Sequence, residues 1–136
     1  MVDSGKPLPH PTEIKLHKKS RSLEVAFDDG SRFNLPCEYL RVYSPSAEVR
    51  GHARGQEVLQ IGKQLVEINE IEPVGTYAVQ LTFSDGHNTG LYSWDYLYEL
   101  GENQETLWAE YLQRMQEAGA SREPAPPIFE ARPKGK

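Results

Sequence analysis

The sequence predicts an α+β fold, with a mostly antiparallel sheet built from two ββα-like hairpin units and helices packed on it. Two observations support this prediction. Alternating apolar and polar residues lead into an Asp-Gly pair twice, at 23–30 and at 79–86. Each copy then returns and reaches a run typical of a helix start, at 37–40 and at 94–97. Asp-Gly between alternating runs favours a tight hairpin, because glycine accepts a positive φ without strain.

The first unit contains strand patterns followed by a short helix. In order, we expect strands at 12–17, 23–27 and 33–35 and a helix at 37–42. Ile14 and Leu16 alternate with polar residues, which is typical of a half-buried strand. Pro36 should end the third strand, since it has no N–H for a sheet hydrogen bond. The helix is expected to carry Tyr39 and Leu40 inward.

The second unit repeats this order and adds a longer helix. We expect strands from about 65 to 71, at 77–83 and at 89–93, and helices at 94–100 and from 103 onward. The break after the first of these strands is expected at Pro-Val-Gly, residues 73–75. Gly101 should stop the first helix, Asn103 should cap the second, and Glu105 suits its positive N-terminal end. Two apolar faces are predicted, one of Tyr77, Val79, Leu81 and Phe83, the other of Leu107, Trp108, Tyr111, Leu112 and Met115.

The remaining segments have a different composition. Residues 1–10 read as a flexible lead, 11–118 as a single domain, and 119–136 as a disordered tail rich in Pro, Ala and Gly. Ile128 and Phe129 form an apolar pair in that tail, which leaves open a short docking motif. Inside the domain, apolar periodicity vanishes over 44–60, and functional residues often lie in an irregular segment of this kind.

Composition narrows the classes of function. The net charge is −5 and no long basic run is present, which argues against nucleic acid or a membrane surface as a partner. A small basic patch of Arg41, Arg50 and Arg54 remains open. Cys37 is the only cysteine, so one chain can form neither a disulfide nor a thiolate metal cluster. No apolar run approaches the roughly 20 residues that span a bilayer, and we expect a cytoplasmic protein.

Three sequence runs carry a resemblance to a known family. They are Leu-Arg-Val-Tyr-Ser-Pro-Ser-Ala-Glu-Val-Arg-Gly-His at 40–52, Phe-Ser-Asp-Gly-His at 83–87 and Trp-Asp-Tyr-Leu at 94–97. They resemble the small N-terminal domain of gamma-butyrobetaine hydroxylases, which also occurs alone in bacteria as a domain of unknown function of the DUF971 type. The resemblance covers about residues 11–100. A similar domain is appended to some P-loop iron–sulfur cluster carriers.

The resemblance implies a degenerate zinc site. In the hydroxylases, three closely spaced cysteines and one histidine hold a structural zinc ion. Those positions fall here on Ser44, Ser46, Val49 and His87. Valine has no donor atom and a serine hydroxyl is a poor zinc ligand beside a thiolate or imidazole. We therefore carry over neither the zinc site nor the oxygenase activity, which belongs to a separate domain.

Three functional hypotheses follow. The preferred one is a non-enzymatic binding or accessory domain that contacts an unknown protein partner through the 41–60 loop and the His87 hairpin. Its candidate surface residues are Arg41, Ser44, Ser46, Glu48, Arg50, His52 and His87. The alternative is an iron- or zinc-binding domain in which His52 and His87 act with a carboxylate or a second chain. The third is an enzyme, for which no nucleophile–base pair, cofactor loop or paired carboxylates are recognisable.

His87, the loop serines and Cys37 each have a structural interpretation as well as a functional one. His87 is expected to hydrogen-bond to the 44–49 loop, filling the place that a metal occupies in the hydroxylases. The serines of that loop are expected to form a turn and a helix cap. Cys37, at a helix start, has the setting of a reactive thiol. Its counterpart in the second unit is Trp94, which favours a buried packing position instead.

Overall fold

The structure is a computed structural model that describes residues 9–51 and 57–124. Two three-stranded antiparallel sheets, ordered β1-β2-β3 and β4-β5-β6, are accompanied by four helices. The strands are β1 (Pro11–His17), β2 (Ser22–Phe27), β3 (Arg32–Pro36), β4 (Ile68–Val74), β5 (Ala78–Phe83) and β6 (Leu91–Ser93). The helices are α1 (Cys37–Val42), α2 (Ala47–Arg50), α3 (Trp94–Glu102) and α4 (Gln104–Ala118). The α+β class and its antiparallel pairing are confirmed, with the strands divided between two sheets.

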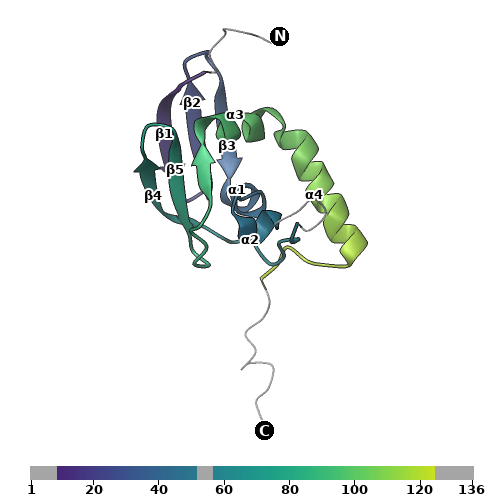
Figure 1. Cartoon of the computed structure of the whole chain (residues 1–136). Helices are drawn as coiled ribbons and strands as arrows, with labels where there is room; N and C mark the ends of the chain where they lie inside the picture. Colours follow the sequence, from purple (N-terminus) through teal and green to yellow (C-terminus); the bar gives the residue numbers. More distant parts are fainter. Residues whose placement is uncertain (1–8, 52–56, 125–136) are drawn as a thin grey trace.

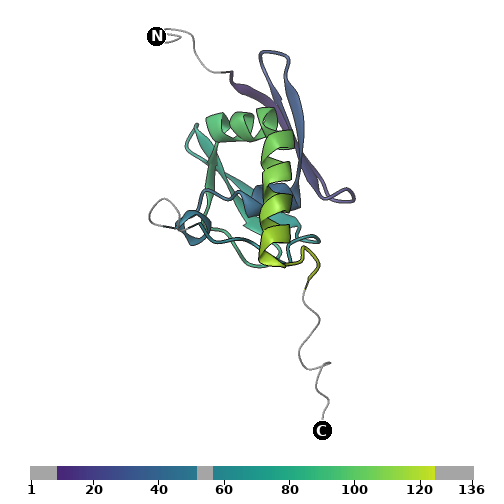
Figure 2. The same cartoon turned by 90° about the vertical axis from the view of Figure 1, so that its right-hand side faces the viewer.

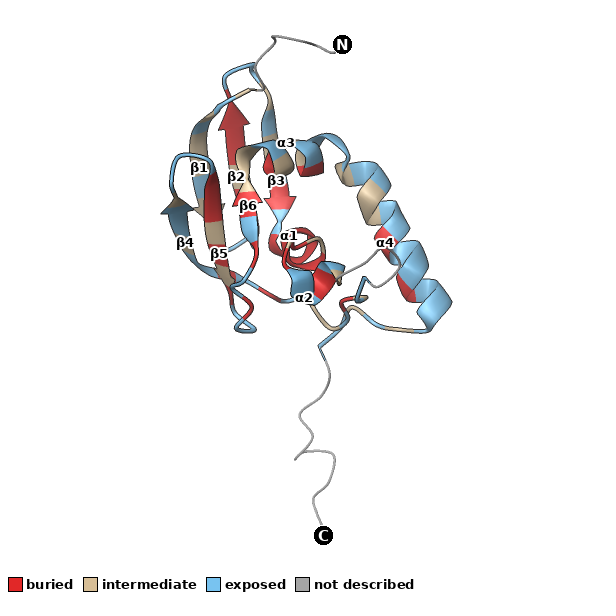
Figure 3. Ribbon diagram, in the orientation of Figure 1, coloured by how far each residue is buried: buried red, intermediate tan, exposed pale blue. Residues whose placement is uncertain are grey.

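The two sheets and the helices enclose one main core. Figure 2 shows the two sheets on either side behind α4, and α3 lies over one end of them in Figure 1. Among the strands, the central strands β2 and β5 carry most of the buried residues, and every residue of α1 is buried as well, as the red segments of Figure 3 show. The core combines Leu23, Val25, Phe27 and Leu35 with Val79, Leu81 and Phe83, and with Tyr39, Leu40, Leu97 and Leu100 from the helices. Burial of this apolar surface is the main force that joins the two units.

The chain folds as two units of the same design. Each unit has three strands followed by a short helix, so the repeated ββα pattern of the sequence extends by one strand at its beginning. In the first turn the N–H of Phe27 donates to the carbonyl of Ser31 at 2.8 Å, and in the second the N–H of Phe83 donates to that of His87 at 2.9 Å. Both turns use a glycine at φ 90°, which favours glycine strongly. The repeated Asp-Gly pattern therefore marks two equivalent hairpins.

The helices of the two units bond reciprocally across the core. The hydroxyl of Tyr39 in α1 donates to the carbonyl of Leu100 in α3 at 2.7 Å. The hydroxyl of Tyr96 in α3 donates to the carbonyl of Tyr43, just after α1, at 2.6 Å. Each tyrosine is the third residue of its helix. This exchange of equivalent bonds gives the two units an approximate twofold relation.

Several element boundaries differ from the sequence predictions. Pro73 lies within β4, an edge strand, where its missing N–H is tolerated. Gly101 does not end α3, because the helix runs to Glu102 and the ring of Phe33 packs against this glycine. Tyr77 lies in the turn before β5 and is exposed, not part of the buried face. Each exception follows from a tertiary contact or a strand position that a local pattern does not contain.

The second helix of the second unit, α4, begins without the predicted hydrogen bond from a capping side chain. Asn103 precedes α4, but its side-chain amide donates to the carbonyl of Glu99 at 2.9 Å and so closes the end of α3. Tyr111 and Met115 of the predicted apolar face are buried, whereas Leu112 is partly exposed. The chain after α4 is held in place as far as the structure describes it. The N–H groups of Gly62 and Gln64 each donate at 2.9 Å to carbonyls of the 121–122 segment.

The predictions for the chain ends fall largely outside the described part. The predicted lead, residues 1–10, overlaps the structure only at 9–10, and the predicted tail, 119–136, overlaps it only at 119–124.

Over the described ranges, no helix is both long enough and apolar enough to cross a membrane. Cys37, the first residue of α1, is buried, and burial raises the pKa of its thiol. That environment agrees with a packing position for this cysteine.

Candidate functional site

The 44–48 segment is shaped by its own serine hydroxyls. Ser44 follows α1, and its Oγ accepts the N–H of Ser46 at 3.2 Å. Ser46 precedes α2, and its Oγ accepts the N–H of Glu48 at 3.1 Å, which satisfies a donor at the start of the helix. The predicted turn and cap are confirmed. A second hydroxyl contact, Ser46 Oγ to Thr89 Oγ1 at 2.7 Å, joins this segment to the β5–β6 loop.

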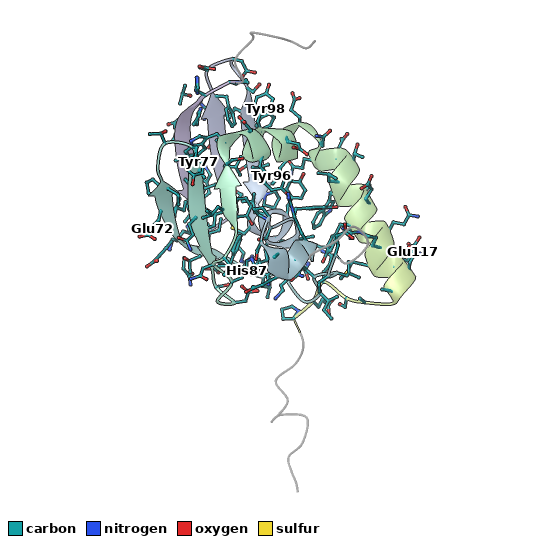
Figure 4. All side chains as sticks on the ribbon, viewed as in Figure 1. Glu72, Tyr77, His87, Tyr96, Tyr98 and Glu117 are labelled. Atoms are coloured by element: carbon teal, nitrogen blue, oxygen red, sulfur yellow. The ribbon has the colours of Figure 1, made fainter. Side chains whose placement is uncertain are left out.

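His87 is aimed into this segment by the second hairpin turn. The carboxylate of Asp85 accepts the N–H of His87 at 3.2 Å, and the positive φ of Gly86 completes the turn. The His87 ring reaches Ser44 Oγ through Nε2 at 2.8 Å and Glu48 Oε1 through Nδ1 at 3.2 Å. Only 3% of the His87 side chain is exposed. Figure 4 shows His87 beside α2. The expected hydrogen bond between this histidine and the 44–49 loop is therefore present.

These contacts indicate a single proton arrangement. The carboxylate of Glu48 can only accept, so Nδ1 carries the ring proton, and Nε2 of a neutral ring accepts the hydroxyl proton of Ser44. The Nδ1–H then donates to the carboxylate of Glu48. Burial lowers the pKa of His87, and the nearby Arg41 charge lowers it further, against a smaller opposite effect of Glu48 and Asp85. The imidazole is therefore neutral at pH 7.

Asp85 connects three parts of the chain. It accepts hydrogen bonds from Arg41 Nε in α1 at 2.9 Å and from Lys63 Nζ in the 57–67 connector at 2.7 Å. Burial alone would raise the pKa of Asp85, but the bonds from Lys63 and the His87 N–H, together with Arg41, outweigh it and hold the pKa at about 2. The Arg41 side chain is only 9% exposed. Its Nη1 has no hydrogen-bond partner among the described residues, so Asp85 is its principal compensation.

The same positions in the first unit form a different kind of cluster. In the first unit, Asp29 accepts a hydrogen bond of 2.6 Å from the hydroxyl of Tyr98 in α3. In the second unit, the equivalent Asp85 accepts one from Arg41 in α1. The Phe27, Phe33 and Tyr98 rings pack edge to face around that turn. Figure 4 places Tyr98 and His87 at opposite ends of the molecule. The turn of the second unit thus carries a polar cluster where the turn of the first unit carries an aromatic one.

Gly90 provides the space for the polar cluster. A Cβ at this position would lie 2.5 Å from Ser44 Oγ and 3.1 Å from Pro45 Cδ. In the other unit the arrangement is reversed, because the large Phe33 on the strand meets the small Gly101 in the helix. Sequence reasoning did not identify Gly90, Lys63 or Thr89 as site residues. Only a comparison of the two units, position by position, could have singled out Gly90.

The order Ser44–His87–Glu48 has the connectivity of a hydrolase triad. Sequence analysis found no base for a serine nucleophile, and the structure places one at hydrogen-bond distance. However, Ser44 is only 1% exposed, and its Oγ also accepts the N–H of Ser46. A nucleophilic oxygen needs an approach path for the substrate carbon and a nearby oxyanion site. The arrangement is therefore suited to holding the loop, and we assign it no catalytic role.

The zinc site of the hydroxylases does not fit these residues. Two ligands of one tetrahedral zinc ion, each at 2.0–2.3 Å from it, are about 3.3 Å or more apart. Ser44 Oγ and His87 Nε2 are 2.8 Å apart and share a proton. Val49 is buried and offers no donor atom. Within residues 9–51 and 57–124, no group of three His, Cys, Asp or Glu side chains is placed to hold a metal ion.

A groove opens beside the polar cluster, between α1, α2, α3, α4 and the connector. Its volume is about 620 Å³. The lining includes Val49, Val58, Leu59, Leu107, Tyr43 and Tyr96, and the charged residues Arg50, Glu57, Glu99, Glu110 and Arg114. The guanidinium groups lie over aromatic rings, with Arg50 at 4.9 Å from Tyr96 and Arg114 at 5.9 Å from Tyr43. Val58, on the groove, is 52% exposed.

The sequence-predicted site residues are brought together only in part. Arg41, Ser44, Ser46, Glu48 and His87 form the polar cluster. Arg50 lies on the groove instead, over Tyr96. His52, the other histidine of the metal hypothesis, and Arg54 of the possible basic patch belong to 52–56, outside the described residues.

Comparison with known proteins assigns the chain to a family. Residues 14–98 match the model of the gamma-butyrobetaine hydroxylase-like, N-terminal family. The chain belongs to this family. Solved structures similar to it include a protein solved by NMR that is 56% identical, with a TM-score of 0.76 and 93% of each chain covered. Another NMR structure is 46% identical, with a TM-score of 0.76, covering 90% of this chain and 96% of the other.

A crystal structure from Acidithiobacillus ferrooxidans extends the comparison. That protein is 43% identical to this chain, with a TM-score of 0.58, covering 68% of this chain and 92% of its own. It is described as a protein of unknown function of the DUF971 family. No curated protein matches the chain significantly. The chain is thus similar over nearly the full length of these three solved chains, and the family assignment carries no activity with it.

Proposed function

We propose that this family member is a non-enzymatic accessory domain that binds a protein partner in the groove between the connector and α4. The observation that supports the proposal is the groove itself, with the exposed Val58 on it. Protein-binding surfaces of this kind combine an apolar centre with a charged rim. The domain is proposed to act in the cytoplasm, as its composition predicts.

The polar cluster makes this surface rigid. The Val58 N–H donates to the carbonyl of Val49 in α2 at 2.7 Å, so the connector is attached to the helix that Ser46 caps. Lys63 attaches the connector a second time, through Asp85. In this proposal, His87 and Ser44 therefore act through the position of α2, and partner contacts are made by groove residues. A preorganised surface binds with a smaller entropy cost than a mobile one.

The charges of the groove favour a basic, apolar partner segment. Its two arginines lie over tyrosine rings, and its lining contains three glutamates, Glu57, Glu99 and Glu110, so acidic groups outnumber basic ones. The whole chain is acidic, with a net charge of −5. A partner helix or extended segment with an apolar side chain next to Lys or Arg fits both features.

The test compares two charge-introducing variants at exposed apolar positions. Val58→Glu changes the groove, and Tyr77→Glu changes a distant exposed turn of the same fold. Partners are captured by chemical crosslinking in native cytosol, and any candidate is then purified and its affinity measured. The proposal expects one protein that binds wild type and Tyr77→Glu equally and loses at least tenfold in affinity, about 1.4 kcal/mol, with Val58→Glu. Binding that is equal in all three proteins, or the absence of any direct binder, would refute it.

A further inference from the structure

A second hollow lies on the other side of α4, near its beginning. It has a volume of about 700 Å³ and is formed by the end of β3, α1, the α3–α4 junction and the first turns of α4. Its apolar surface comes from Pro36, Trp108, Ala109 and Leu112. Its acidic groups are Glu38, Glu102 and Glu105. This surface is separate from the groove proposed for the partner, with which it shares no lining residue.

The chain itself returns to this hollow after α4. Arg122 lines it and forms two hydrogen bonds of 2.8 Å with the buried carboxylate of Glu38. The Arg122 guanidinium also lies 5.2 Å from the ring centre of Trp108. A bidentate arginine–carboxylate pair with a buried partner is a strong and directional contact. The last described residues are therefore fixed at the edge of the hollow.

We propose that the remaining segment of the same chain, residues 125–136, docks in this hollow. The segment contains an apolar pair, Ile128 and Phe129, and three basic residues against one acidic residue. Ile128 is four residues beyond Pro124, which gives a reach of about 13 Å at roughly 3.3 Å per residue. The apolar pair then covers Trp108 and Leu112.

The charges of the hollow favour residues 125–136 as its occupant over the acidic surface of a second copy of the domain. Arg132, Lys134 and Lys136 follow the apolar pair, and Glu102 and Glu105 are the exposed carboxylates of the hollow. Attachment at Arg122 also gives the segment a high effective concentration at this site, which a separate partner lacks. The docked segment would shield the most apolar exposed part of α4 from solvent.

The test uses the full chain with a spin label at Ala131→Cys. The single native thiol, Cys37, is buried and is replaced by alanine to direct the label. The proposal expects selective loss of the NMR signals of the Trp108 indole and the Leu112 amide, with recovery after reduction of the label. It also expects recovery in an Ile128→Ser, Phe129→Ser variant and weaker loss in Glu102→Gln, Glu105→Gln. Glu117→Gln, at the far end of α4, is the matched control and should leave the loss unchanged.

Two results would overturn the proposal. One is signal loss confined to residues next to the described chain end, which would mean that the segment does not contact the hollow. The other comes from a mixture of two samples, spin-labelled protein at natural isotope abundance and isotope-labelled protein without a spin label. It is loss of the Trp108 signal in this mixture only. That result would mean that a second copy supplies the segment.

Discussion

Replacement of Asp85 by asparagine tests the polar cluster most severely. The Asp85→Asn variant keeps the size of the side chain and one oxygen acceptor, but it removes the charge that faces Arg41 and Lys63. Arg41 would then be a buried guanidinium with no carboxylate, and its Nη1 already has no partner in the described part of the chain. Breaking one side of such a pair is costly because the other charge stays desolvated.

The size of the effect follows from the pKa of Asp85. The pKa falls from its usual 3.8 to about 2 in the folded protein. A difference of about 1.8 units at 1.36 kcal/mol each gives about 2.4 kcal/mol of stabilisation as an upper value. Because the Asp85 side chain is 26% exposed, screening by solvent reduces this to about 1.5 kcal/mol. The stranded Arg41 charge adds to it, and we expect a loss of about 2 kcal/mol at pH 7.

The assay is urea unfolding followed by tryptophan fluorescence, repeated across pH. A carboxylate whose folded pKa is lowered contributes stability that is present above its unfolded value of 3.8 and is lost as pH falls towards about 2. Wild type and Asp85→Asn should therefore converge over this range. Asp29→Asn, the equivalent position of the first unit, is the control and should lose less, since Asp29 binds a neutral tyrosine hydroxyl. An Asp85→Asn loss below about 0.5 kcal/mol, or one independent of pH, would refute this reasoning.

Three further predictions concern the same cluster. Gly90→Ala should lose about 2 kcal/mol by overpacking against Ser44 Oγ, and the loss should shrink in a Ser44→Ala background, as measured by urea unfolding. Wild-type stability should fall as pH drops below 6.5, because the pKa of His87 is lowered by folding and the unfolded chain takes up the proton first. His87→Gln should remove that part of the pH dependence, and a dependence that persists unchanged in the variant would contradict this assignment. A fluorophosphonate probe should leave Ser44 unlabelled, as checked by mass spectrometry, because the oxygen is buried; labelling lost in His87→Gln would contradict the structural role.

The fold was predictable from the sequence where local pattern and tertiary contact agree. The two Asp-Gly hairpins and the helix at Cys37–Val42 follow from alternation, glycine conformation and the proline before the helix. The errors occur where distant residues decide the outcome. Gly101 looks like a helix stop, but the Phe33 ring takes the space of its missing side chain. Asn103 looks like a cap for α4, but it bonds backward to Glu99.

The candidate site was predictable only as a set of segments. The sequence indicates that the 44–48 serines and His87 belong together, through the family resemblance and the turn chemistry. It gives no sign that Lys63, twenty-two residues before Asp85, shares that carboxylate with Arg41. The groove depends on how α4 lies against the connector, and no local pattern specifies the spacing between two packed elements.

The central claim is that His87 is a neutral, hydrogen-bonded member of the cluster that holds α2 and the connector in place. Nitrogen-15 NMR of the imidazole ring tests it directly, in protein purified without an affinity tag and titrated with zinc. We predict a neutral ring at pH 7, protonated on Nδ1 towards Glu48 and accepting from Ser44 on Nε2, with no change on addition of zinc. A charged ring, the opposite tautomer, or an Nε2 signal shifted by stoichiometric metal would contradict it.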